Sequence, residues 1–277
     1  MTKKIEPKLP PFFGGLFLIA GPCAIESRAM LMQTAESLQK MCAARNLPLI
    51  LKSSFDKANR TSADGARGAG MIEGLDILAE AKAAFGLPVL TDVHLPQQAQ
   101  KVAEVADVLQ IPAFLCRQTD LIEECAKTGK TMLIKKGQFA APGAMKHAAA
   151  KAKASGAADV LLCERGFCFG YGDLVADMRA LVQMRAFGYP LVFDAAHAAQ
   201  KPGGDATTGG AREMVRPLAR AAVATGIDGL FVEAHPNPQE AISDRDTQLP
   251  LSEMPKLLDE VLALRAAMDT VQADKTQ

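Results

Sequence analysis

The sequence contains no tryptophan and only two tyrosines among its 277 residues. It also lacks an excess of charge, because 31 lysines and arginines balance 31 aspartates and glutamates. A protein that binds nucleic acid or an anionic membrane through its overall field needs a basic excess, so the balance argues against both partners. Any anion site must therefore be built locally.

Long apolar runs are missing as well. The longest, residues 16–20 and 190–196, fall far short of the roughly 20 residues that cross a bilayer. Residues 1–11 are charged and contain prolines, without the apolar core of a signal peptide. Six scattered cysteines predict reduced, mostly buried thiols and no disulfide framework. We expect a soluble, cytoplasmic protein.

What the sequence does contain is an eightfold alternation of short apolar runs and longer stretches with helical periodicity. The expected strands are residues 16–21, 49–54, 88–93, 108–112, 132–136, 159–164, 190–194 and 229–234. The expected helices begin at Ser27 and then cover residues 73–85, 96–105, 119–128, 142–154, 174–187, 212–224 and 251–271. Continuous apolar strands between helices are typical of a buried parallel sheet. Eight regular units favour an α/β fold with a single closed (β/α)8 TIM barrel over an open doubly wound sheet.

Four candidate metal ligands follow or end expected strands. Cys23 follows the first strand, His197 the seventh, Glu233 ends the eighth and Asp244 lies in the next loop. Strand ends of a barrel converge on one face, so these side chains are expected to meet there. A thiol, an imidazole and two carboxylates suit Zn²⁺, Fe²⁺ or Mn²⁺. The spacing leaves a plainer interpretation open, because such a cysteine is often a buried apolar residue and the glutamate could pair with a lysine.

Cations gather at other strand ends. They are Lys52, Lys57, Arg60, Arg117, Lys135, Lys136 and Arg165, with Asn59 and Asp92 as polar neighbours. Cations at buried strand ends would be costly unless an anion met them, which favours a phosphorylated ligand over a solvated surface. The glycine-rich segment 201–210 is expected to be a lid over this face or a surface connection.

Several segments resemble a known family. Residues 19–27 (IAGPCAIES) resemble the opening strand of the phosphoenolpyruvate-dependent 3-deoxy-ulosonate synthases. Residues 52–62 (KSSFDKANRTS) resemble one branch, the 3-deoxy-D-manno-octulosonate 8-phosphate synthases. Residues 110–121 (QIPAFLCRQTDL), 135–139 (KKGQF), 164–171 (ERGFCFGY) and 231–238 (FVEAHPNP) agree with that branch. The resemblance covers about residues 16–262.

The resemblance implies a function. Phosphoenolpyruvate would condense with D-arabinose 5-phosphate and water to give the octulosonate 8-phosphate and inorganic phosphate, for lipopolysaccharide (Kdo) synthesis. The fold would be a barrel over residues 16–277, assembled as a homotetramer, with residues 1–15 as an N-terminal extension capping the barrel base. The metal-independent class has asparagine where this chain has Cys23. The set Cys23, His197, Glu233 and Asp244 therefore implies the metal-dependent class, with one Zn, Fe, Mn or Co ion per subunit.

The resemblance also implies residue roles. Lys52, Lys57, Gln110, Ala113, Lys135 and Arg165 would bind phosphoenolpyruvate, with Asp92 beside them. Asn59, Arg60 and Thr61 would bind the aldose, and Arg117 would reach its phosphate from a neighbouring subunit. At position 61 the family commonly has serine. The candidate catalytic residues are Lys57, His197 and Asp244.

Two alternatives stay open. The sister synthase uses erythrose 4-phosphate and typically carries Lys-Pro-Arg-Thr where this chain has Lys57-Ala58-Asn59-Arg60. A barrel that binds sugar phosphates without catalysis is the other alternative, because a fold by itself does not establish chemistry.

Overall fold

Eight parallel strands form a closed barrel in the computed structural model, which describes residues 9–59, 65–202 and 208–273. The strands are β1 (Phe17–Gly21), β2 (Leu49–Lys52), β3 (Val89–Asp92), β4 (Val108–Ile111), β5 (Thr131–Lys135), β6 (Val160–Glu164), β9 (Leu191–Asp194) and β12 (Gly229–His235). Each pairs with the next, and β12 pairs back with β1 with Phe17 opposite Gly229. The predicted (β/α)8 barrel is confirmed.

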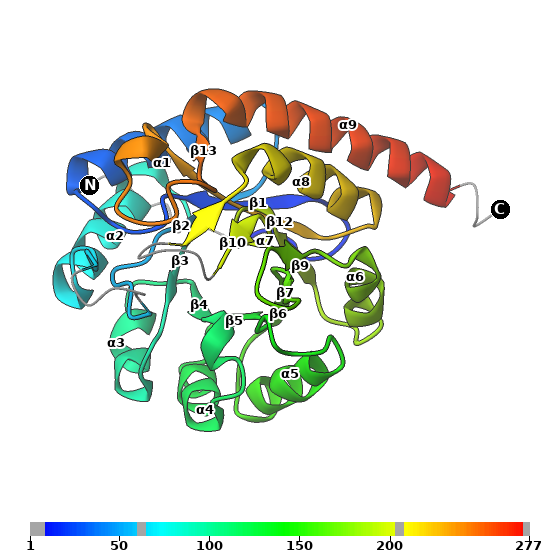
Figure 1. The fold of residues 1–277 in the computed structure, drawn as a ribbon. Helices are drawn as coiled ribbons and strands as arrows, with labels where there is room; N and C mark the ends of the chain where they lie inside the picture. Colours follow the sequence, from blue (N-terminus) through cyan, green and yellow to red (C-terminus); the bar gives the residue numbers. More distant parts are fainter. Residues whose placement is uncertain (1–8, 60–64, 203–207, 274–277) are drawn as a thin grey trace.

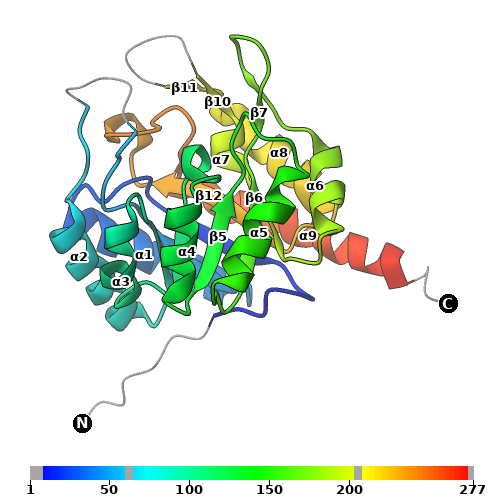
Figure 2. The same cartoon turned by 90° about the horizontal axis from the view of Figure 1, so that it is seen from below.

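The helices form an outer ring around the strands (Figure 1). They are α1 (Arg28–Ala43), α2 (Met71–Phe85), α3 (Ala99–Ala103), α4 (Thr119–Lys127), α5 (Ala144–Ala154), α6 (Met178–Arg185), α8 (Val215–Ala224) and α9 (Met254–Ala273). Ser27 caps α1 as expected, since its hydroxyl accepts a hydrogen bond from the Met30 amide at 3.2 Å. The C-terminal half of α9 runs past the barrel (Figure 2). Within the described part of the chain, no helix combines the length and apolarity needed to span a membrane.

Several expected helices were too long. The helix expected over residues 96–105 is a short η1 turn (Pro96–Gln98) followed by α3. The helix expected from residue 174 begins only at Met178, because residues 174–175 form β8 (Leu174–Val175) in a hairpin with β7 (Phe167–Cys168). Asp177 then caps α6 by accepting a hydrogen bond from the Arg179 amide. A short helix, α7 (Ala195–Ala198), a hairpin of β10 (Gln200–Lys201) and β11 (Gly209–Gly210), and β13 (Leu249–Pro250) were not predicted.

The barrel interior divides into an apolar base and a charged rim. Ten buried side chains fill the base: Phe17, Ile19, Ile50, Leu90, Val108, Leu133, Leu161, Cys163, Val192 and Phe231. Gly229 makes room for the Phe17 ring, since a Cβ there would lie 2.5 Å from it. Leu9 and Phe12, in the part of the N-terminal segment that is described, pack against this cluster. The loops that follow the strands lie at the opposite end of the barrel (Figure 2).

Candidate active site

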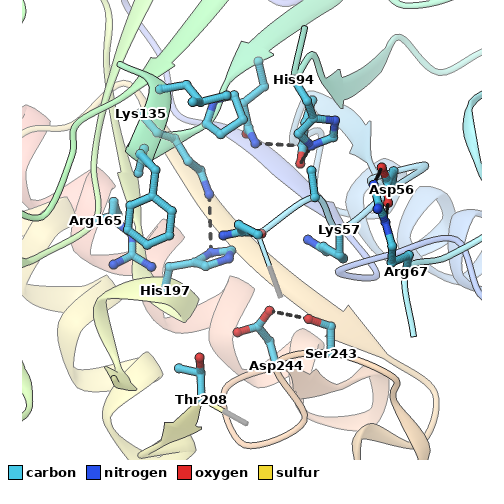
Figure 3. Close-up of a pocket in the computed structure, with 18 of the residues that line it drawn as sticks. Asp56, Lys57, Arg67, His94, Lys135, Arg165, His197, Thr208, Ser243 and Asp244 are labelled. Atoms are coloured by element: carbon cyan, nitrogen blue, oxygen red, sulfur yellow. Dashed lines mark hydrogen bonds and ion pairs between the residues drawn. The ribbon is translucent and has the colours of Figure 1, made fainter. Parts of the chain in front are cut away.

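A cavity of about 790 Å³ lies at the C-terminal ends of the strands. Lys57, Lys135, Arg165 and His197 converge on it from different sides (Figure 3). These side chains come from loops or strand ends after β2, β5, β6 and β9, as the geometry of a closed barrel requires. The cavity therefore combines cations that are distant along the chain into one anion-binding surface.

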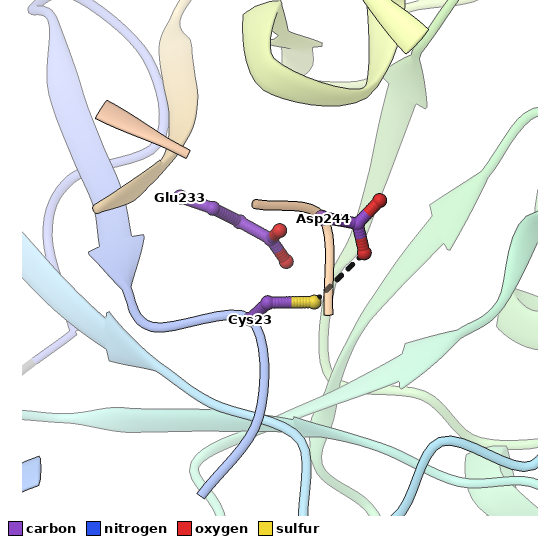
Figure 4. Close-up of side chains that lie close together, drawn as sticks. All are labelled: Cys23, Glu233 and Asp244. Carbon is purple, nitrogen blue, oxygen red and sulfur yellow. Dashed lines mark hydrogen bonds between the residues drawn. The ribbon is translucent and has the colours of Figure 1, made fainter. Parts of the chain in front are cut away.

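Three of the four predicted metal ligands meet beside this cavity. Donor atoms of Cys23, Glu233 and Asp244 all lie within 4.8 Å of one another. The Cys23 thiol donates to Asp244 Oδ2 at 2.9 Å (Figure 4). The fourth, His197, flanks the group, with its Nε2 atom 3.7 Å from Glu233 Oε1. Asp244 has a left-handed backbone conformation (φ +50°), which aspartate tolerates better than most residues.

The electrostatics of this group suit a divalent cation. Glu233 Oε2 is buried and has no hydrogen-bond partner among the described residues, which is a costly arrangement unless a ligand meets it. Burial, together with the carboxylates of Asp244 and Glu233, raises the pKa of the Cys23 thiol well above its usual value. A bound transition ion would reverse this effect, because coordination deprotonates a thiol. One sulfur, one imidazole and two carboxylates therefore fit such an ion.

Asp194, which was not predicted as a site residue, orients His197 and Lys135. It ends β9 and is fully buried. One carboxylate oxygen accepts from the His197 amide at 2.9 Å, whereas the other lies 2.7 Å from His197 Nδ1 and 2.5 Å from Lys135 Nζ. Burial opposes ionisation, but His197 and Lys135 outweigh it and lower the pKa of Asp194. With Nδ1 held by Asp194, the Nε2 atom of His197 faces Glu233.

A second network surrounds Lys57. The Lys57 ammonium donates to Ser54 Oγ at 3.1 Å, and that hydroxyl donates to Asp92 Oδ2 at 2.8 Å. Gln110 donates to Asp92 Oδ1 at 2.9 Å. Burial opposes the charge on Lys57, but the negative groups around it, among them the carboxylates of Glu233, Asp92 and Asp244, outweigh it and raise its pKa. Lys57 is therefore an ammonium at neutral pH.

Lys52 and Arg165 contact different groups of the site. Lys52 is 1% exposed and donates to Glu233 Oε1 at 2.7 Å and to the Cys23 carbonyl at 3.0 Å, so it supports the metal-binding group. Arg165 is also buried, and it donates from Nη2 to the side-chain carbonyl of Gln200. Gln200 was not predicted as a site residue, because its role depends on contacts distant in sequence.

The remaining predicted residues fall in three places. Asn59 and Ala113 line the cavity, as do Pro202 and Thr208 on either side of residues 203–207. Arg117 is exposed and lies outside the set that lines the cavity of its own chain. Arg60 and Thr61 lie outside the described residues, as does the middle of the expected lid. The roles assigned to individual site residues stay predictions.

Comparison with known proteins identifies the family. A family model described as the DAHP synthetase I family matches residues 14–269. Three similar proteins are each named 2-dehydro-3-deoxyphosphooctonate aldolase. That of Trichlorobacter lovleyi is 52% identical over 271 residues, 97% of this chain and 100% of the relative. That of Acidithiobacillus ferrooxidans is 55% identical over 243 residues, 87% of this chain and 86% of the relative. That of Rhizobium meliloti is 54% identical over 252 residues, 91% of this chain and 90% of the relative. The chain belongs to the DAHP synthetase I family.

Proposed function

We propose that the chain condenses phosphoenolpyruvate with D-arabinose 5-phosphate and water. The products are 3-deoxy-D-manno-octulosonate 8-phosphate, used in lipopolysaccharide (Kdo) synthesis, and inorganic phosphate. The observation that carries this proposal is the convergence of Lys57, Lys135 and Arg165 on one cavity beside the Cys23, Glu233 and Asp244 group. The relatives' names, which describe a phosphooctonate, favour the eight-carbon product over the seven-carbon product of the sister synthase.

The residues of the cavity suit each step of this reaction. C3 of phosphoenolpyruvate bonds to the aldehyde carbon, the water oxygen adds to C2, and the resulting phosphohemiketal loses phosphate by cleavage of its C–O bond. Cations in a cavity that limits water hold the anion and stabilise charge that develops on phosphate. Lys57, as an ammonium with a raised pKa, is suited to stabilise negative charge on the aldehyde oxygen or the leaving phosphate by donating hydrogen bonds, but poorly suited to transfer a proton.

A substrate comparison tests this proposal. We expect phosphate release from phosphoenolpyruvate with D-arabinose 5-phosphate to exceed that with erythrose 4-phosphate by at least about 100-fold in kcat/KM, because the cavity must fit the longer aldose. A preference for erythrose 4-phosphate would support the sister reaction. Phosphate release with neither aldose would support a barrel that binds sugar phosphates without catalysis.

We further propose that Cys23, His197, Glu233 and Asp244 hold one Zn, Fe, Mn or Co ion per subunit. The Glu233 Oε2 atom, which has no hydrogen-bond partner among the described residues, and the mutual proximity of three donors support this assignment. When bound, such an ion polarises a carbonyl oxygen or lowers the pKa of bound water. In this arrangement His197 and Asp244 serve catalysis as ligands, because an imidazole nitrogen bound to metal is not a free base.

Metal removal tests this assignment. We expect a strong chelator to abolish activity, and Mn²⁺ or Zn²⁺ to restore it. Elemental analysis of the untreated protein should find about one transition ion per chain. Full activity in chelator, with no metal found by elemental analysis, would contradict the assignment.

We also propose a cytoplasmic homotetramer. Arg117 is exposed on the segment after β4 and does not line the cavity of its own chain, which supports a role at a neighbouring subunit. Light scattering should give the mass of four chains of 29.3 kDa each. A monomer that is fully active would contradict a contribution of Arg117 across subunits.

A further inference from the structure

Gln200 connects the two halves of the candidate site. It lies in β10, three residues after His197. Arg165 donates from Nη2 to the Gln200 side-chain carbonyl, and the Gln200 amide nitrogen donates to Asp244 Oδ1. One neutral side chain therefore joins a cation of the anion-binding surface to a carboxylate of the metal-binding group.

The chemistry of these contacts suits an amide. A guanidinium only donates hydrogen bonds and an ionised carboxylate only accepts them, so the connecting group must accept at one end and donate at the other. This requirement also fixes which end of the Gln200 amide faces Arg165. A glutamate at this position would keep the Arg165 contact but repel Asp244, whereas a lysine would keep the Asp244 contact but repel Arg165.

Gln200 bonds to only one atom of each partner, Arg165 Nη2 and Asp244 Oδ1, so it leaves the other terminal atom of each side chain for other contacts. Arg165 Nη1 is buried and lacks a hydrogen-bond partner in the described part of the chain, so it can still donate to an anion. The second carboxylate oxygen of Asp244 is 2.9 Å from the Cys23 sulfur, within the group proposed to bind metal. Gln200 thus limits the freedom of the Arg165 and Asp244 side chains without itself bonding to Arg165 Nη1 or to Asp244 Oδ2.

We propose that Gln200 is a positioning residue that sets the separation and orientation of Arg165 and Asp244. The inference rests on the proposed anion and metal sites. Its consequence is that one substitution at Gln200 weakens two binding events that involve different ligands. A residue that only fills space in the loop would change folding stability without selectively changing either affinity.

Two variants separate these possibilities, with inorganic phosphate and Mn²⁺ as probes. Gln200→Met keeps the length of the side chain and removes both hydrogen bonds. We expect it to lower the affinity for each probe about tenfold, the effect typical of losing a group that orients a ligand. Gln200→Glu should lower phosphate affinity at least about tenfold, because a carboxylate neutralises Arg165. It should lower Mn²⁺ affinity less than Gln200→Met does, because the added negative charge beside the cation offsets part of the lost orientation of Asp244.

Calorimetry on the metal-free protein would measure phosphate binding, and the electron paramagnetic resonance signal of free Mn²⁺ would measure metal binding. Gln39→Met, on α1 and bonded to the Phe85 carbonyl, is the matched control and should leave both affinities unchanged. The proposal is overturned if Gln200→Met changes both affinities less than twofold, or if Gln200→Glu leaves phosphate affinity within twofold of wild type. Wild-type protein that binds no Mn²⁺ would contradict the metal site and the proposal that Gln200 positions Asp244 as a ligand. The phosphate measurements would then still test whether Gln200 positions Arg165.

Discussion

The base and the rim of the barrel are built from the same strands, but the base buries apolar side chains and the rim buries charged ones. On β5, Leu133 and Lys135 are two residues apart and point to the same face, yet Leu133 packs in the apolar base and Lys135 lines the cavity. On β12, Phe231 and Glu233 show the same change. All four residues are at most 4% exposed. Burial is therefore shared by both regions, and what differs is the chemistry that is buried.

The rim tolerates buried charge in part because opposite charges pair there. Lys52 lies 2.7 Å from Glu233, and Lys135 lies 2.5 Å from Asp194. Buried ion pairs add little net stability, because desolvation offsets most of their attraction. The base must therefore supply most of the stability of the barrel interior, whereas the rim supplies binding and catalysis. This division predicts that matched substitutions in the two regions have different effects.

The largest effect is expected from Lys135→Met at the rim. Methionine preserves the packing against Phe231 but removes the ammonium that faces the cavity. We expect kcat/KM for phosphoenolpyruvate to fall about 1000-fold, or about 4 kcal/mol. The variant loses a charge-assisted contact with the anionic substrate, and the buried Asp194 carboxylate loses one of its positively charged partners.

Steady-state kinetics would measure this loss, with circular dichroism to verify folding. The matched control is Lys127→Met on α4, whose ammonium is exposed and pairs with Glu124. It should leave kcat/KM unchanged, since exposed pairs contribute little. A fall of less than tenfold for Lys135→Met would show that the rim does not depend on this cation.

The next largest effect is expected from Leu133→Ala at the base. Leu133 is fully buried, so its truncation leaves a cavity and should lower the free energy of unfolding by about 3 kcal/mol. We expect kcat/KM of the folded enzyme to stay within about threefold of wild type, because the rim is held by its own contacts. Urea unfolding and kinetics on the same sample would test the separation. A parallel collapse of activity in fully folded protein would show that base and rim are not independent.

The sequence predicts the base better than it predicts the rim. The eight barrel strands were predicted to within a few residues because each is a continuous apolar run. The convergence of Cys23, Glu233 and Asp244 also followed from the rule that strand ends meet. The hairpin of β7 and β8 was missed because two-residue strands carry no periodicity. Gln200 was missed because its contact with Asp244 joins residues 44 positions apart, and no local pattern encodes it.

The smallest effect concerns the response of a rim carboxylate to acid. Burial opposes the charge on Asp92, but His94, Lys52 and Lys57 outweigh it, so its pKa is lower in the folded protein than in the unfolded chain. The unfolded chain therefore takes up a proton at higher pH. The stabilisation from ionised Asp92 is complete above the unfolded pKa of about 3.9 and is lost as pH falls from there through the folded pKa, by up to about 1.4 kcal/mol per pH unit.

Asp92→Asn removes this titration. We expect its free energy of unfolding to depend less steeply on pH than that of wild type below about pH 4, with the difference in slope approaching 1.4 kcal/mol per unit. Urea unfolding at a series of pH values would measure both slopes. Asp259→Asn, which removes an exposed partner of Arg45, should change the slope far less, because solvent screens that pair. Equal slopes for wild type and Asp92→Asn would mean that the rim stabilises the Asp92 carboxylate no better than water does. The rim would then not be a region that favours buried charge at this residue.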